Sequence, residues 1–186
     1  MKTITTIPAV GSENTAPNHP DANLLCMQCG LCCDGSLYGK VPISSVDNFD
    51  HLKAFGGRQG AKGKHVPQPC AAQQNRACTI YPYRPKVCVQ YRCHLLTQYE
   101  EQKIPFQEAE NIIGETIEHS NRVRKALLTA TNGIDAPSRQ LYQQLANSAF
   151  PIKPEIALIL LDFAALQIRL NKHFRLNRSL IEKKPI

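Results

Sequence analysis

The sequence predicts a mostly α-helical protein with minor irregular or β content, in which a cysteine-rich half packs on a helical bundle. All eight cysteines lie in residues 24–98, among short candidate elements. Three apolar patterns at helical spacing follow in residues 99–186. A chain of 186 residues fits one domain with a real core. We therefore expect a single domain over residues 24–186, built from these two parts.

The composition is that of a globular protein, with 42% apolar and 20% charged residues. No apolar run reaches the roughly 18 residues that a membrane span requires. Residues 1–23 lack the apolar core of a secretory signal and predict a flexible tail. We expect a cytoplasmic protein without a membrane partner. In a reducing compartment, eight thiols indicate metal ligands or redox groups rather than disulfides.

The helical part contains three predicted helices. Apolar residues recur every three to four positions from 106 to 128, and Asn132-Gly133 is a stop signal. Asp135 can cap a second helix that has Pro137 in its first turn. A third begins at Pro154 and is apolar almost all round, so we expect it at the centre of the bundle.

The cysteine-rich part contains shorter elements. Residues 36–43 predict a short strand or sheet edge. Residues 44–57 predict one short helix, with Ser44 or Ser45 as the N-cap. The basic, glycine-rich stretch from Arg58 to His65 does not have the spacing of a phosphate-binding loop. We interpret it as a mobile surface loop, with an anion-contacting loop as the alternative.

The stretch CMQCGLCC contains two overlapping C-x-x-C motifs, which share Cys29, and ends on adjacent cysteines. Two intervening residues allow a tight turn to direct both sulfurs at one metal. Adjacent side chains of an extended chain point to opposite sides. Cys32 and Cys33 would then serve two neighbouring metals, or one cluster through a distorted turn.

Four further cysteines follow at irregular spacing. A helix predicted to start at Pro85 places Cys88 in its first turns, with Cys93 about 140° further around the axis. Either the helix is irregular or these two sulfurs serve different sites. Isolated buried cysteines, such as Cys70, can also be simple apolar residues. The predicted metal ligands are Cys26, Cys29, Cys32, Cys33, Cys70, Cys78, Cys88 and Cys93.

Several residues near the cysteines could support a metal site. Tyr81 and Tyr83 could cover its edge, and Arg84 can donate N–H groups to thiolates, although ordinary packing explains all three equally well. A single histidine such as His94 is more often a surface or core residue than a ligand. Four cations lie between or beside cysteines and could offset thiolate charge: Arg76, Arg84, Lys86 and Arg92.

The motifs CMQCGLCC and CAAQQNRACTIYPYRPKVCVQYRC resemble the YkgJ-type CxxCxxCC family of zinc- or iron-chelating domains over residues 24–98. The resemblance implies metal chelation by these cysteines. Some longer relatives with such clusters are flagellin lysine methylases that are thought to use an iron–sulfur centre. The second half of this chain lies outside the signature, so the resemblance does not extend that activity to it.

Three functions follow from these patterns. The first is a metal-binding protein without turnover, in which zinc or an iron–sulfur cluster joins the two parts. The second is an iron–sulfur enzyme or electron-transfer protein. The third is a zinc module that binds nucleic acid through its net charge of +7. Because the basic residues are dispersed and Trp is absent, we do not expect nucleic acid as a partner. Thiolates suit both zinc and iron, and the sequence identifies no catalytic residue or protein partner.

Overall fold

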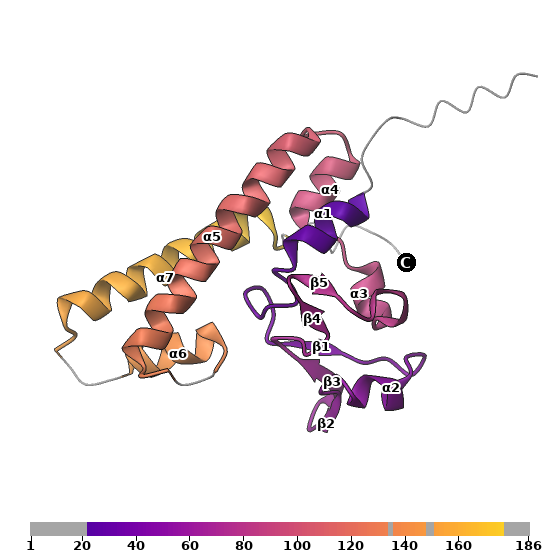
Figure 1. The fold of residues 1–186 in the computed structure, drawn as a ribbon, viewed down its shortest axis with the longest axis horizontal. Coiled ribbons are helices and arrows are strands. Elements are labelled where there is room, and N and C mark those ends of the chain that lie inside the picture. Colours follow the sequence, from indigo (N-terminus) through magenta and orange to yellow (C-terminus); the bar gives the residue numbers. More distant parts are fainter. Residues whose placement is uncertain (1–21, 134–135, 148–150, 177–186) are drawn as a thin grey trace, which may run out of the picture.

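The computed structural model describes residues 22–133, 136–147 and 151–176. It is mostly helical with minor sheet content, as predicted. The short strands gather at one end of the molecule, and the long helices α5 and α7 extend from the other (Figure 1). Helices α1 and α4 lie at the junction. The predicted flexible tail, apart from its last two residues, lies outside the described residues.

The described part of the chain begins with α1 (Ala22–Cys29), whose last turn carries the first C-x-x-C motif. Strand β1 (Lys40–Pro42) and helix α2 (Phe49–Lys53) follow, as predicted. The predicted N-cap of α2 was wrong. Asn48 is the cap, because its side chain accepts a hydrogen bond from the backbone N–H of His51 at 3.0 Å. The hydroxyl of Ser44 instead donates to Asp47 at 2.7 Å.

The predicted mobile loop from Arg58 to His65 is a β-hairpin. It is formed by β2 (Arg58–Gly60) and β3 (Gly63–Pro67), which pair antiparallel with Gly60 opposite Gly63. Gly63 has φ +106°, a conformation that favours glycine and permits the tight two-residue connection. Strand β1 pairs with the other edge of β3, giving the order β1-β3-β2. The basic residues Arg58, Lys64 and His65 therefore belong to strands of a sheet.

Short elements carry the remaining cysteines. Strands β4 (Gln73–Gln74) and β5 (Ala77–Cys78) form a second hairpin. A 3-10 helix, η1 (Tyr81–Tyr83), precedes α3 (Lys86–Gln90), which begins after Pro85 as predicted. The chain is extended at Tyr91, and Cys93 then caps α4 (His94–Glu100). Cys88 and Cys93 therefore belong to different helices.

The helical part matches the prediction in its elements. Helices α5 (Phe106–Ala130), α6 (Ser138–Ala146) and α7 (Pro154–His173) are all present, while the proposed cap Asp135 lies outside the described residues. The predicted central position of α7 was wrong. One face packs on α5 and α6, but three apolar side chains on the other are 65–69% exposed: Leu158, Leu161 and Ile168.

One core cluster joins the two parts of the molecule. Leu31 and Leu95 from the cysteine-rich part pack in the same cluster as Leu127 and Leu170 from the helices. Phe174, which follows α7, is 1% exposed and belongs to this cluster. A smaller cluster lies beneath the sheets and contains Leu52, Val66, Ala72 and Ile80. Within the described ranges, no helix is long and apolar enough to span a membrane.

Candidate metal centre

The eight predicted ligands gather around two adjoining cavities, of about 30 and 340 Å³. All eight are free, half-buried cysteines. The smaller cavity is lined by Cys26, Cys29, Cys32 and Cys93. The larger is lined by Cys26, Cys32, Cys33, Cys70, Cys78 and Cys88. The structure therefore brings together cysteines that are up to 67 residues apart in the sequence, from Cys26 to Cys93.

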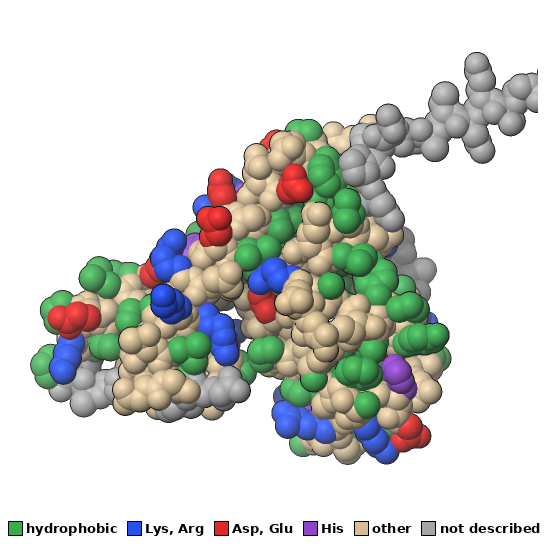
Figure 2. All heavy atoms as spheres, viewed as in Figure 1, with side chains coloured by type: hydrophobic (Ala, Val, Ile, Leu, Met, Phe, Trp, Pro, Cys, Tyr) green, Lys and Arg blue, Asp and Glu red, His purple; other side chains and the backbone are tan. Residues whose placement is uncertain are grey.

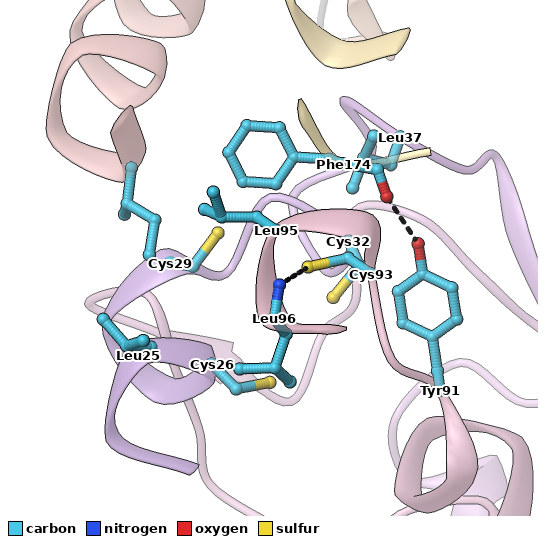
Figure 3. A pocket seen from close by; sticks show the side chains of 11 residues that line it. Leu25, Cys26, Cys29, Cys32, Leu37, Tyr91, Cys93, Leu95, Leu96 and Phe174 are labelled. Atoms are coloured by element: carbon cyan, nitrogen blue, oxygen red, sulfur yellow. Dashed lines mark hydrogen bonds between the residues drawn. The ribbon is translucent and has the colours of Figure 1, made fainter. Parts of the chain in front are cut away.

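The smaller cavity lies between α1, the turn that follows it, and the start of α4. Cys26 and Cys29 are three positions apart in α1 and therefore share one side of the helix. Figure 3 shows these two side chains with Cys32 and Cys93 around a common space. Apolar side chains complete the wall, among them Leu37, Leu95 and Phe174. The core between the two parts thus packs against this group of sulfurs.

The larger cavity is lined by cysteines from separate segments. Cys78 ends β5, and Cys88 lies in α3. The backbone N–H of Cys70 donates to the carbonyl oxygen of Cys33 at 2.8 Å, which joins that segment to the CMQCGLCC turn. Burial raises the pKa of Cys88 to about 12, and the nearby Cys33, Cys70 and Cys78 thiols add to this rise. These four cysteines are therefore electrostatic neighbours.

The adjacent cysteines lie in a tight turn rather than in extended chain. The N–H groups of Cys33 and Asp34 both donate to the carbonyl oxygen of Gly30 at 3.0 Å. The Sγ atoms of Cys32 and Cys33 are 4.0 Å apart. The backbone here is therefore a turn, as in the second alternative from the sequence, and not the extended chain in which adjacent side chains point to opposite sides. Both side chains line the larger cavity, and Cys32 also lines the smaller one.

Arg76 and Gln73 hold this turn from the second hairpin. Arg76 donates through Nε to the carbonyl oxygen of Cys29 at 2.8 Å and pairs with Asp34 at 3.0 Å. Gln73 donates to the carbonyl oxygen of Gly30 at 2.9 Å. Gly30 has φ +60°, and an added Cβ would lie 2.7 Å from the carbonyl oxygen of Arg76. The motif glycine is thus required by both backbone conformation and space.

Burial makes the metal-free thiols weak acids. It raises the pKa of Cys93 to about 11, and it also raises the pKa values of Cys26, Cys70 and Cys78. The hydrogen bond with Cys32, followed by burial, raises the pKa of Cys33. Because metals bind the thiolate form, metal binding at these sulfurs must displace protons.

Backbone N–H groups oppose this effect at four of the sulfurs. The N–H of Leu96 donates to the Sγ of Cys93 at 3.4 Å (Figure 3). Burial raises the pKa values of Cys29, Cys70 and Cys78. Hydrogen bonds from the backbone N–H groups of following residues make each of these rises smaller. A donor that faces a sulfur stabilises its thiolate form. This arrangement suits thiolates that bind a metal.

Two buried polar atoms beside the larger cavity have no hydrogen-bond partner within the described part of the chain: Oε1 of Gln68 and Nε of Arg84. The guanidinium of Arg84 lies 3.7 Å from the centre of the Tyr81 ring. Burial raises the pKa values of Cys26 and Cys78, and Arg84 opposes both rises. A half-buried cation whose buried Nε has no acceptor fits a cavity that holds an anionic thiolate–metal group.

The sulfurs surround these cavities without converging on one point. Within residues 22–133, 136–147 and 151–176, no three His, Cys, Asp or Glu side chains are close enough to hold one metal ion. Side chains must therefore turn inward to bind a single ion, or a larger cluster must occupy the space between them. The sulfur donors fit both zinc and iron.

A family comparison agrees with this donor set. Residues 25–113 match a family model, CxxCxxCC, described as "Putative zinc- or iron-chelating domain". Residues 25–113 are thus similar to this family, and we refer to them below as the CxxCxxCC domain. The match ends within α5, so most of the helical part lies outside it. No curated protein and no solved structure gave a significant match to the chain.

The tyrosines, histidine and basic residues that the sequence placed near the cysteines do not all lie at the cavities. Tyr81 and Arg84 line the larger cavity, whereas Tyr83 is 72% exposed and lies away from both cavities. His94 lines neither cavity; its backbone N–H donates to the carbonyl oxygen of Phe174 at 3.3 Å. Among the other predicted cations, Arg76 lines the larger cavity and holds the turn, whereas the backbone N–H of Lys86 binds Asp47.

Sequence reasoning missed three residues at the site. Tyr91 lines both cavities, and its hydroxyl donates to the carbonyl oxygen of Phe174 at 3.2 Å. Its position between two motif cysteines was a signal for it. Gln68 and Phe174 gave no such signal, because neither belongs to a cysteine motif. Only the folded chain brings them to the cavity walls.

Proposed function

We propose that this chain is a metal-binding protein whose CxxCxxCC domain chelates zinc or iron through the thiolates of its eight cysteines. One observation carries this proposal: every cysteine of the chain lines one of two adjoining cavities. Backbone N–H groups and Arg84 favour the thiolate form there. Structural zinc and iron–sulfur sites use such sulfur donors.

The proposed metal would stabilise the domain. Its cysteines come from α1, α3, β5, the cap of α4 and the intervening turns. These elements are short, and α3 and β5 contain no fully buried residue. Structural zinc contributes about 10–16 kcal/mol of binding free energy in small fingers, as much as the whole stability of many domains. We expect metal removal to unfold the CxxCxxCC domain.

The test is elemental analysis and a visible spectrum of the full chain purified without oxygen, followed by circular dichroism during chelation. We expect bound zinc or iron and a loss of folded structure as the metal is removed. Tyr83→Phe is the matched control, because this tyrosine is exposed away from both cavities, and it should retain all the metal. A metal-free chain with an unchanged fold would contradict the proposal.

The larger cavity favours a second candidate, an iron–sulfur enzyme or electron-transfer protein. Its volume of about 340 Å³ far exceeds that of a single ion, and six cysteines line it. The exposed side chains of Met27 and Tyr38 form part of its wall, so this cavity extends to the protein surface. This candidate predicts brown protein with iron and sulfide in matching amounts. A colourless zinc protein would exclude it.

The charge distribution gives no support to nucleic-acid binding. On the face shown in Figure 2, Lys and Arg side chains are scattered over both parts of the molecule and form no continuous band. Several are paired with carboxylates, as Arg76 is with Asp34. A net charge of +7 without such a band does not indicate a binding surface. We therefore do not propose this function.

A further inference from the structure

We propose that the CxxCxxCC domain holds two metal centres that meet at its adjacent cysteines, an inference that rests on the metal binding proposed above. The first centre is bound by Cys26, Cys29, Cys32 and Cys93. The second is bound by Cys33, Cys70, Cys78 and Cys88. The division assigns each sulfur once and gives each centre four thiolates.

The two cavities divide the cysteines in this way. Cys29 and Cys93 line the smaller cavity and not the larger. Cys33, Cys70, Cys78 and Cys88 line the larger cavity and not the smaller. Cys26 and Cys32 line both. Four thiolates complete a tetrahedral zinc site or an iron–sulfur cluster. The second group already has four, so the two shared cysteines complete the first.

The adjacent cysteines provide the junction between the two centres. The Sγ atoms of Cys32 and Cys33 are 4.0 Å apart, and Cys32 lies against both cavities. If the domain held only one four-coordinate metal, four of the eight half-buried cysteines would bind no metal. With one cysteine of the pair in each centre, every sulfur has a metal. This use explains why the motif ends on two cysteines.

The two centres differ in their surroundings. The smaller cavity has a volume of about 30 Å³, room for about one or two water-sized atoms, and its wall includes buried residues such as Leu25, Leu95 and Phe174. The larger cavity has exposed residues in its wall, including Tyr38 and Lys40. We therefore expect metal at the second centre to be released to a chelator before metal at the first.

Paired serine variants of the full chain test this division. Cys29→Ser with Cys93→Ser removes two ligands of the first centre, and Cys70→Ser with Cys88→Ser removes two of the second. We expect each pair to lose one centre and keep the other, so that the two losses add up to the wild-type metal content. Val89→Ser is the matched control, because this exposed residue shares α3 with Cys88 and lines neither cavity.

A second measurement does not depend on whether the variants fold. Metal release from the wild-type chain to excess chelator should occur in two phases that together account for all the bound metal. Release in one phase, or loss of all metal from either folded paired variant, would overturn the two-centre division and leave metal binding intact. A wild-type chain without metal after anaerobic purification would overturn metal binding itself.

Discussion

At the scale of single residues, Gly30 fixes the turn that presents the adjacent cysteines. Its φ of +60° and the 2.7 Å approach of the Arg76 carbonyl to an added Cβ leave no space for a side chain. We predict that Gly30→Ala lowers stability by about 1–3 kcal/mol. Urea unfolding of the metal-bound protein measures this loss. Gly39→Ala is the control, because an added Cβ there has no neighbour within 4 Å.

Arg84 gives a second prediction at this scale. Burial raises the pKa values of Cys26 and Cys78, and Arg84 opposes the rise. Without its charge these thiols would have higher pKa values, and protons would compete better with the metal. We predict that Arg84→Gln shifts metal release to a higher pH, measured by acid titration of bound metal.

The control for Arg84→Gln is Arg58→Gln, in the exposed β2 strand away from both cavities. It should release metal at the wild-type pH. An equal release pH for both variants and the wild type would contradict the assignment of Arg84 as a positive neighbour of the sulfurs.

Cysteine spacing predicted the candidate ligands, but their distribution over the two cavities could not be predicted from spacing alone. The position of Cys32 relative to Cys33 depends on the hydrogen bonds from Cys33 and Asp34 to the carbonyl oxygen of Gly30. No periodic pattern in the sequence predicts such a turn. Phe174 reaches the site through tertiary packing, which no local motif encodes.

At the scale of elements, Asp162 of α7 joins this helix to α5. It lies 2.9 Å from Nε2 of His119 and within 3.2 Å of the Arg122 guanidinium. The hydrogen bond from Arg122 lowers the pKa of Asp162, and the bond from His119 adds to this effect. The ionised Asp162 carboxylate therefore stabilises the fold at pH values above the usual carboxyl pKa. This contribution is lost as pH falls through the lowered pKa of Asp162.

We predict that Asp162→Asn lowers the free energy of unfolding at pH 7 by about 0.5–1 kcal/mol, since the pair is partly exposed. The difference from wild type should shrink as pH falls below the usual carboxyl range and through the lowered pKa of Asp162. Urea unfolding at pH 7 and over a series of acidic pH values measures it. A difference that stays constant with pH would show that the ion pair is not its cause.

The long helices were predictable because their apolar residues repeat over several turns, as from Phe106 to Leu128. The hairpin of β2 and β3 was not predicted, because strands of only three and five residues with Gly60 and Gly63 next to their connection resemble a loop. The exposed face of α7 was also missed, since a pattern that is apolar all round does not show which side has a partner.

At the scale of the whole molecule, Phe174 connects the helices to the candidate metal centre. It is 1% exposed and lines the smaller cavity, and its carbonyl oxygen accepts a bond from Tyr91. We predict that Phe174→Ala costs about 3–5 kcal/mol and speeds metal loss from the first centre. Thermal unfolding and chelator kinetics measure the two effects.

Leu158→Ala is the control for Phe174→Ala, because Leu158 belongs to the exposed face of α7. It should change neither quantity by a large amount. Since the two parts share one core cluster, we also expect residues 24–186 to unfold in one transition. Separate transitions for the CxxCxxCC domain and the helices would contradict the prediction of a single domain.

Native mass spectrometry of the full chain, purified without oxygen, tests the central claim most directly. It weighs the bound metal or cluster and resolves partly loaded forms. Two centres per chain are predicted, with a one-centre form appearing during chelation as the more accessible second centre is emptied. A chain that never holds more than one centre would contradict the division of the eight cysteines, and one that holds none would contradict metal binding by this domain.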